Sequence, residues 1–172
     1  MKSCFVFTAG ALAAVLLSAC ATSVSGPSAS AELLARSGST VSGNVRFSET
    51  NGNLRIEAQV AGLTPGEHGF HVHEVGDCSA PDASCAKGHF NPAGKPHGHY
   101  GSSERHGGDM VNLGADADGK ASYSVEVSGL SLTGPNGVIG RSVVIHADPD
   151  DYKSQPAGNS GKRIACGVIA AH

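Results

Sequence analysis

The sequence predicts an antiparallel all-β domain, built as a sandwich or a flattened barrel. Residues 41–49 and 54–61 alternate apolar and polar side chains on either side of an Asn-Gly pair, which is a strong signal for a β-hairpin. No segment carries a sustained helical repeat of apolar residues. The 24 Gly and 8 Pro among 172 residues imply many turns, and the absence of Trp leaves a core of Val, Ile, Leu and Ala.

The first 19 residues have the pattern of a lipoprotein signal peptide. Lys2 precedes an apolar run at 6–17, which is too short to span a bilayer, and the sequence LSAC that ends at Cys20 has the form of a lipobox. We therefore expect cleavage after residue 19 and lipidation of Cys20. The alternative is an ordinary signal peptide, in which Cys20 is incidental.

A flexible tether at 20–31, small and polar, separates the lipidated Cys20 from a folded domain at 32–172. This organisation predicts a membrane-anchored lipoprotein of the bacterial cell envelope or periplasm.

Further strand patterns lie within the domain at 69–74, 121–127, 142–146 and 163–169. Two long irregular stretches, 75–108 and 147–162, separate them. Loops of this length inside a compact domain usually carry function. The histidines crowd one strand and the loops beside it, so we expect the functional site there.

Charge and cysteine content narrow the function classes. A net charge of −3 offers no basic surface, which argues against nucleic acid as a partner, and nine His stand out in a chain with only 16% charged residues. Cys4 is lost with the signal peptide. Three thiols then remain in a compartment where disulfides persist, at Cys78, Cys85 and Cys166. They allow one bridge and one free cysteine, and the sequence alone does not pair them.

One candidate metal site begins at the sequence HGFHVHEVGDC. His71 and His73 stand two residues apart on a predicted strand, so their side chains project to the same face and can reach one ion together. His89 and His146 could complete a set of four histidines. A tetragonal arrangement of nitrogen ligands favours copper. Two histidines spaced in this way on a strand are more often structural than metal-binding when they occur alone. The metal-site interpretation therefore depends on the whole set of four.

A second candidate site lies in the first long loop, where His97, His106 and Asp109 follow the spacing H-x8-H-x2-D. Two imidazoles and a carboxylate are typical zinc ligands. A fourth ligand is needed, and His89 is near in sequence. The residues alone leave His89 available to both sites.

Five motifs in this order resemble signatures of the copper/zinc superoxide dismutases, over residues 32–169: HGFHVHEVGDC, GHFNP, RHGGDM, IGRSVVIHADPDD and GKRIACGVI. The spacing of Cys78 and the short second loop resemble the bacterial envelope branch. The resemblance implies a Greek-key antiparallel β-barrel or sandwich with two long functional loops.

The resemblance also implies one copper and one zinc per chain. Copper would be held by His71, His73, His89 and His146, and zinc by His89, His97, His106 and Asp109, with the His89 ring bridging the two ions. The implied enzyme is an oxidoreductase that converts superoxide to O2 and hydrogen peroxide through alternate reduction and reoxidation of the copper. A non-catalytic periplasmic copper-binding or buffering protein is the alternative function.

Four further roles come from the resemblance. Asp150 would orient one ligand of each metal, Arg163 would guide the anionic substrate, and His89 would also supply a proton. Cys78 and Cys166 would form the disulfide, with Cys85 as a competitor for the bridge. A homodimer is possible. Lys87, where small residues are usual, and the extra thiol of Cys85 depart from the family pattern, and His99 matches no ligand position.

Overall fold

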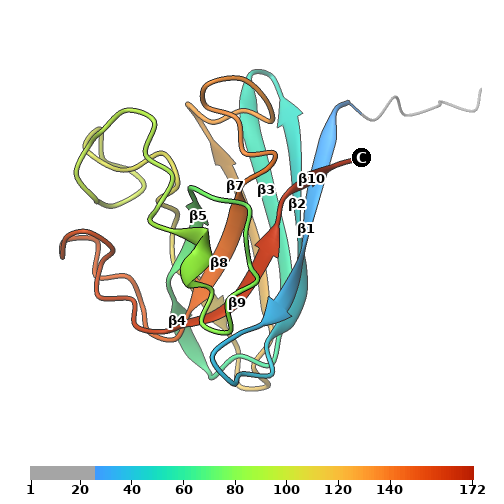
Figure 1. Ribbon diagram of the computed structural model, residues 1–172, viewed down its shortest axis with the longest axis vertical. Helices are drawn as coiled ribbons and strands as arrows, with labels where there is room; N and C mark the ends of the chain where they lie inside the picture. The colour runs from blue at the N-terminus through green and yellow to red at the C-terminus, as the bar shows by residue number, and fades with distance from the viewer. Residues whose placement is uncertain (1–25) are drawn as a thin grey trace, which may run out of the picture.

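The computed structural model describes residues 26–172 (Figure 1). In this range the elements are β1 (Ser28–Ala35), β2 (Ser42–Thr50), β3 (Asn53–Ala61), β4 (Gly66–His68), β5 (Phe70–His73), the 3-10 helix η1 (Ser84–Ala86), β6 (Leu113–Ala115), β7 (Ala121–Val127), β8 (Ser142–His146), β9 (Arg163–Val168) and β10 (Ala170–Ala171). The predicted signal peptide and Cys20 lie outside the described residues. Within 26–172, no helix is long and apolar enough to cross a membrane.

The main strands form one curled antiparallel sheet in the order β5-β8-β9-β1-β2-β3-β7, with β10 added to β1 (Figure 1). The strand β1 joins the two halves of this sheet, because residues 28–33 pair with β2 whereas Leu34 and Ala35 pair with β9. After long connections β9 returns to lie beside β1, as in a Greek key. A separate small sheet pairs β4 with β6. The predicted all-β antiparallel fold class is confirmed.

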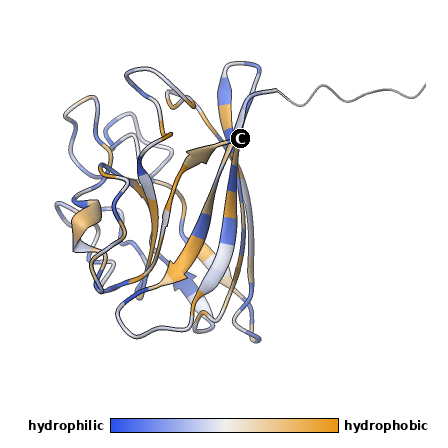
Figure 2. Cartoon of the chain, turned by 45° about the vertical axis from the view of Figure 1, so that its right-hand side comes forward, coloured by the Kyte–Doolittle hydropathy of each residue, from blue (hydrophilic) through white to orange (hydrophobic). Residues whose placement is uncertain are grey.

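The hairpin predicted around the Asn-Gly pair is confirmed as β2–β3, paired without interruption from Ser42↔Ala61 to Thr50↔Asn53. Asn51 and Gly52 both have positive φ, at 52° and 80°, as the tight turns that suit the twist of a hairpin require. Hydrophilic and hydrophobic residues alternate along the long strands (Figure 2), and the inward side chains meet in one core. Its largest members include Phe47, Phe70, Leu33, Leu54 and Ile56.

The structure extends the sheet beyond the predicted strands. The sequence places the start of the domain at residue 32, but β1 begins at Ser28, inside the segment expected to be a tether. Ala29 and Ala31 alternate into the core, and small side chains of this kind give a weak strand signal. The strands β4, β6 and β10 are two or three residues long, too short to show an alternation.

Candidate metal centre

The site is organised by β5, whose four residues are all buried. This strand pairs with β8, and it also bonds to two parts of the first long loop. Phe90 donates its N–H to the Val72 carbonyl at 2.8 Å, and Val72 donates to the Gly108 carbonyl at 3.0 Å. Only glycine fits at position 108, since a Cβ there would lie 2.1 Å from the Val72 oxygen. These contacts bring His89 and Asp109 beside the strand, where they bridge to His73 and His71.

The first predicted histidine set is brought together around one point. Its ligand atoms all lie within 4.8 Å of one another, and every member is buried: His71, His73, His89 and His146. The Nε2 atoms of His73 and His146 are 3.4 Å apart. His146 reaches this point from the end of β8, where the register with β9 shifts after Ile145.

The second predicted set is also brought together, again with its ligand atoms within 4.8 Å and all members buried: His89, His97, His106 and Asp109. The Asp109 Oδ1 atom lies 2.8 Å from His89 Nδ1, 3.0 Å from His97 Nδ1 and 3.4 Å from His106 Nδ1. The other oxygen of Asp109 accepts the N–H groups of His106 and Gly98, at 2.8 and 3.1 Å. The carboxylate is therefore held in place by the loop's own backbone.

Three of the histidine rings are fixed on their far side by another group. Asp150 accepts from His71 Nε2 at 2.8 Å and from His97 Nε2 at 2.9 Å, and it thus connects one member of each set. His73 Nδ1 donates to the Lys87 carbonyl at 2.9 Å. Such partners fix the orientation and basicity of a metal-ligating imidazole.

The remaining nitrogens fit the metals that the sequence predicts. Among the described residues, His71 Nδ1 and His89 Nε2 are buried without a hydrogen-bond partner. Buried polar atoms are rarely left unpaired in proteins, and each one needs an explanation. The first set offers only imidazoles, which suit copper, and the second offers imidazoles and a carboxylate, which suit zinc. Bound metal ions would satisfy these atoms.

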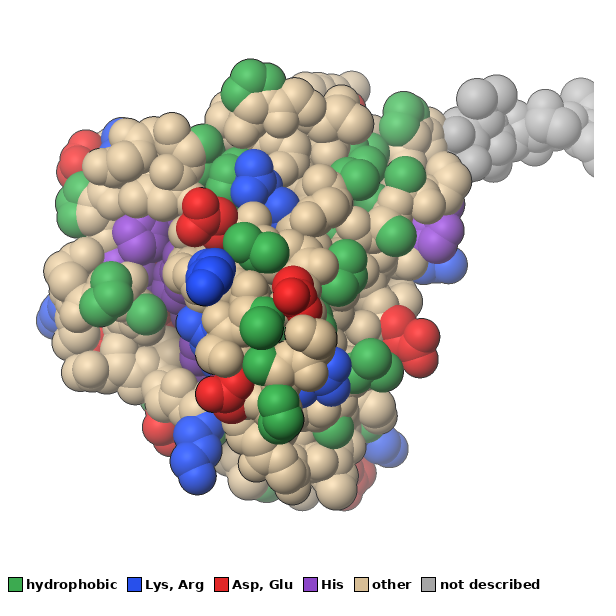
Figure 3. Space-filling view, in the orientation of Figure 1, with side chains coloured by type: hydrophobic (Ala, Val, Ile, Leu, Met, Phe, Trp, Pro, Cys, Tyr) green, Lys and Arg blue, Asp and Glu red, His purple; other side chains and the backbone are tan. Residues whose placement is uncertain are grey.

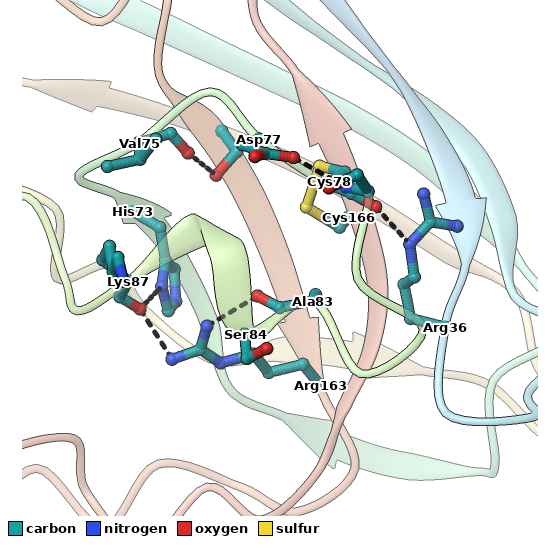
Figure 4. The surroundings of a disulfide bond; sticks show 12 residues. Arg36, His73, Val75, Asp77, Cys78, Ala83, Ser84, Lys87, Arg163 and Cys166 are labelled. Atoms are coloured by element: carbon teal, nitrogen blue, oxygen red, sulfur yellow. Dashed lines mark hydrogen bonds between the residues drawn. A yellow bond between two sulfur atoms is a disulfide. The ribbon is translucent and has the colours of Figure 1, made fainter.

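A disulfide closes the loop over this centre (Figure 4). Cys78 and Cys166 are bonded, which confirms the pair that the resemblance implies, and Cys85 is the free cysteine in the described part of the chain. Arg36 Nε donates to the Cys78 carbonyl at 2.8 Å. The same loop also binds the side chain of Arg163, at the start of β9. Its guanidinium donates to the carbonyls of Ala83 and Lys87 at 2.7 and 2.6 Å.

Arg163 and His146 border a cavity of about 360 Å³. The other lining residues come from the second long loop and are neutral: Gln155, Pro156, Ala157, Asn159, Ser160 and Gly161. Within the described structure, no carboxylate lines this cavity, so its positive guanidinium suits a small anion.

The comparisons with known proteins agree with this geometry. The family model for copper/zinc superoxide dismutase (SODC) matches residues 41–169. The chain belongs to this family. A superoxide dismutase [Cu-Zn] of Deinococcus radiodurans is 44% identical over 167 residues, which cover 90% of each chain. One from Onchocerca volvulus is 44% identical over 144 residues, or 77% of this chain and 90% of that one. The crystal structure of the clock protein EA4 covers 85% of this chain and 95% of its own, with 39% identity and a TM-score of 0.78.

The chain is thus a superoxide dismutase, an oxidoreductase that uses copper and zinc and acts on superoxide. The family assignment favours the enzyme over the non-catalytic copper-binding alternative.

The surroundings of the superoxide dismutase site shift the pKa values of its histidines in opposite directions. Burial lowers the pKa of His71 to about 4, although Asp150 opposes it, and burial lowers the pKa of His73 and His146 well below the usual range. Burial also lowers the pKa of His97, but bonds to Asp109 and Asp150 outweigh it and raise that pKa to about 9. His71, His73 and His146 are therefore held as neutral imidazoles, the form that binds metal.

Two histidines outside both sets have other roles. His68 is buried and its Nδ1 donates to the His146 carbonyl at 2.8 Å, so it supports a neighbouring strand end. His99 is exposed and packs edge-on to Tyr152, with ring centroids 4.7 Å apart.

Sequence reasoning missed the groups that position Asp150. Asn112 accepts the Asp150 N–H at 2.9 Å and donates to its carbonyl at 3.0 Å, and the Tyr152 N–H donates to Asp150 Oδ1 at 2.7 Å. Asn112 lies 38 residues before Asp150 in the sequence, and it is part of no motif that would have identified it.

Proposed function

We propose that His71, His73, His89 and His146 hold the copper of this superoxide dismutase, and that His89, His97, His106 and Asp109 hold the zinc, one ion of each per chain. The observation that carries this assignment is the position of the His89 ring. Its Nδ1 faces Asp109 at 2.8 Å and His106 at 3.4 Å, whereas its Nε2 is buried without a partner on the side of the other set. One imidazole can therefore serve both ions.

Copper, when bound, supplies the one-electron chemistry that oxidises one superoxide to O2 and reduces another to hydrogen peroxide. The protein's own groups bring the substrate and one of its protons. Arg163 attracts and orients the anion in the cavity next to His146. His89 would supply one of the two protons of hydrogen peroxide from Nε2, and the second would come from solvent. Asp150 holds one ring of each set in place while this happens.

The test is to load the purified protein with copper and zinc, measure both metals, and follow superoxide removal against the metal-free form. We expect one copper and one zinc per chain and activity only in the loaded protein. Protein that takes up zinc alone, even with copper in excess, would contradict the two-metal assignment.

A charge reversal at Arg163 should slow the reaction. Attraction of the anion becomes repulsion in Arg163→Glu, so we expect the rate at low ionic strength to fall by about tenfold or more, with metal content little changed. The residual rate should rise with salt, opposite to wild type, because screening now removes a barrier. The neutral Arg163→Gln is the matched control, since it also loses the bonds to Ala83 and Lys87. Equal losses in both variants would refute the steering role.

We also propose that the protein is a lipoprotein of the bacterial envelope, anchored through Cys20 after removal of residues 1–19. The lipobox-like sequence before Cys20 supports this, together with a disulfide of the kind that persists in exported proteins. In a bacterial host, Cys20→Ala should move the protein from the membrane fraction to the soluble periplasmic fraction. An unchanged membrane fraction would contradict lipidation at this residue. A homodimer stays a prediction.

A further inference from the structure

The tip of the second long loop, residues 153–160, forms most of the wall of the cavity beside Arg163. On the face shown in Figure 3, histidine side chains are visible between the two long loops. Most hydrogen bonds of the tip stay inside the second loop, such as the bond from the Gly158 N–H to the Ser154 carbonyl at 2.7 Å. Within residues 26–172, Gln155 is the only residue of the tip that forms hydrogen bonds to a residue outside this loop. One side chain therefore provides the hydrogen bonds that fasten the tip to the rest of the domain.

The amide of Gln155 binds both backbone groups of His97. Its Oε1 atom accepts the His97 N–H at 2.9 Å, and its Nε2 atom donates to the His97 carbonyl at 2.8 Å. An amide can accept and donate at the same time, whereas a carboxylate of the same length can only accept. Because Gln155 is otherwise exposed to water, these two bonds must offset the rotamer freedom that its long side chain loses. The pair of bonds thus explains why the residue is a glutamine.

The second loop holds His97 at another point as well. The His97 Nε2 atom lies 2.9 Å from Asp150 Oδ1 at the start of this loop, and its Nδ1 atom lies 3.0 Å from Asp109 Oδ1 within the second set. A Cβ at position 158 would lie 2.8 Å from His97 Nε2, so the tip can approach the ring this closely only with glycine there. Asp150 fixes the ring of His97, and Gln155 fixes its backbone. We therefore expect any shift of His97 to move the cavity wall with it.

We propose that Gln155 is a positioning residue that fastens the cavity wall to His97, so that zinc held by the second set also fixes the place where the substrate anion binds. The inference rests on the proposed zinc role of His97 and on the proposed anion cavity beside Arg163. Gln155 is neutral, so it acts through the position of the loop and not through attraction of the anion. Coupling between two binding sites is reciprocal. An anion in the cavity should therefore slow the release of zinc.

The test uses the copper- and zinc-loaded protein, with azide as the anion. In Gln155→Ala, which removes both bonds, we expect zinc release to become about tenfold faster, because two hydrogen bonds of ordinary strength are lost. Azide should bind about threefold more weakly to this variant, and saturating azide should slow zinc release about threefold in wild type but not in the variant. A chelating dye measures zinc release, and the absorbance of the copper site measures azide binding.

Gln155→Met keeps the length of the side chain and removes both bonds, so it should behave like Gln155→Ala. The matched control is Gln59→Ala, which removes an exposed amide that donates to Ser122 Oγ at 2.8 Å between β3 and β7, and it should change neither measurement. Unchanged zinc release in Gln155→Ala, or wild-type behaviour of Gln155→Met, would overturn the proposal. Faster zinc release with unchanged azide binding would also overturn it, because Gln155 would then support the zinc ligand alone. A wild-type protein that takes up zinc but no copper would instead contradict the proposed function.

Discussion

Replacing His71 with alanine should reduce superoxide removal to background. We expect the rate to fall by more than about 10³-fold, which is less than the whole acceleration that enzymes typically provide. His71 belongs only to the first set, to which it offers its unpartnered Nδ1 atom. Without it, copper loses one of four ligands in a buried site. The zinc set keeps all its members, so zinc content should stay close to one per chain.

Metal analysis and a rapid-mixing superoxide assay on the same samples check this prediction. Asp150 loses one partner in the variant but keeps His97 at 2.9 Å, so a modest weakening of zinc binding is compatible with the assignment. His99→Ala is the matched control, because His99 is an exposed histidine outside both sets, and it should change neither metal nor rate. Equal loss of copper and zinc in His71→Ala would show that the two sets are not distinct.

Two parts of the histidine sets could be predicted from the residues themselves, because their signals are local. The assignment of His89 and His146 came instead from the family resemblance. The alternation on β5 places His71 and His73 on one face, and the spacing from His97 to Asp109 falls within one loop. The meeting of the two sets could not be predicted from spacing alone. It depends on β-bridges and backbone bonds between β5 and residues 89–109, which form only when the whole sheet closes.

The supporting groups were beyond prediction for a different reason. The Lys87 carbonyl, which accepts from both His73 and Arg163, is a backbone atom, and its direction is set by the path of the loop rather than by its side chain. Asn112 holds Asp150 from a separate segment. Any sequence-based list of site residues therefore favours side chains with metal-ligating or charged groups, and it omits the backbone atoms and distant amides that orient them.

The disulfide has the largest expected effect on stability. Cys78 and Cys166 are 88 residues apart in sequence, and both are buried. On the chain-entropy model, closing a loop of this length destabilises the unfolded chain by about 4 to 5 kcal/mol, an upper value. Cys78→Ser should therefore lower the midpoint of thermal unfolding by roughly 10 °C or more. Differential scanning calorimetry under non-reducing conditions measures this change.

The same variant should weaken zinc binding, because the bridge fastens a loop that runs on into the metal site. That loop supplies the Ala83 and Lys87 carbonyls to Arg163, and His89 follows two residues later. Cys85→Ser, the matched control, removes the free thiol of the same loop and should leave both stability and zinc affinity nearly intact. Peptide mapping without reduction should recover Cys78 joined to Cys166 in wild type. If Cys85→Ser were as destabilising as Cys78→Ser, the bridge would not be what holds the loop, and the link between the disulfide and metal retention would fail.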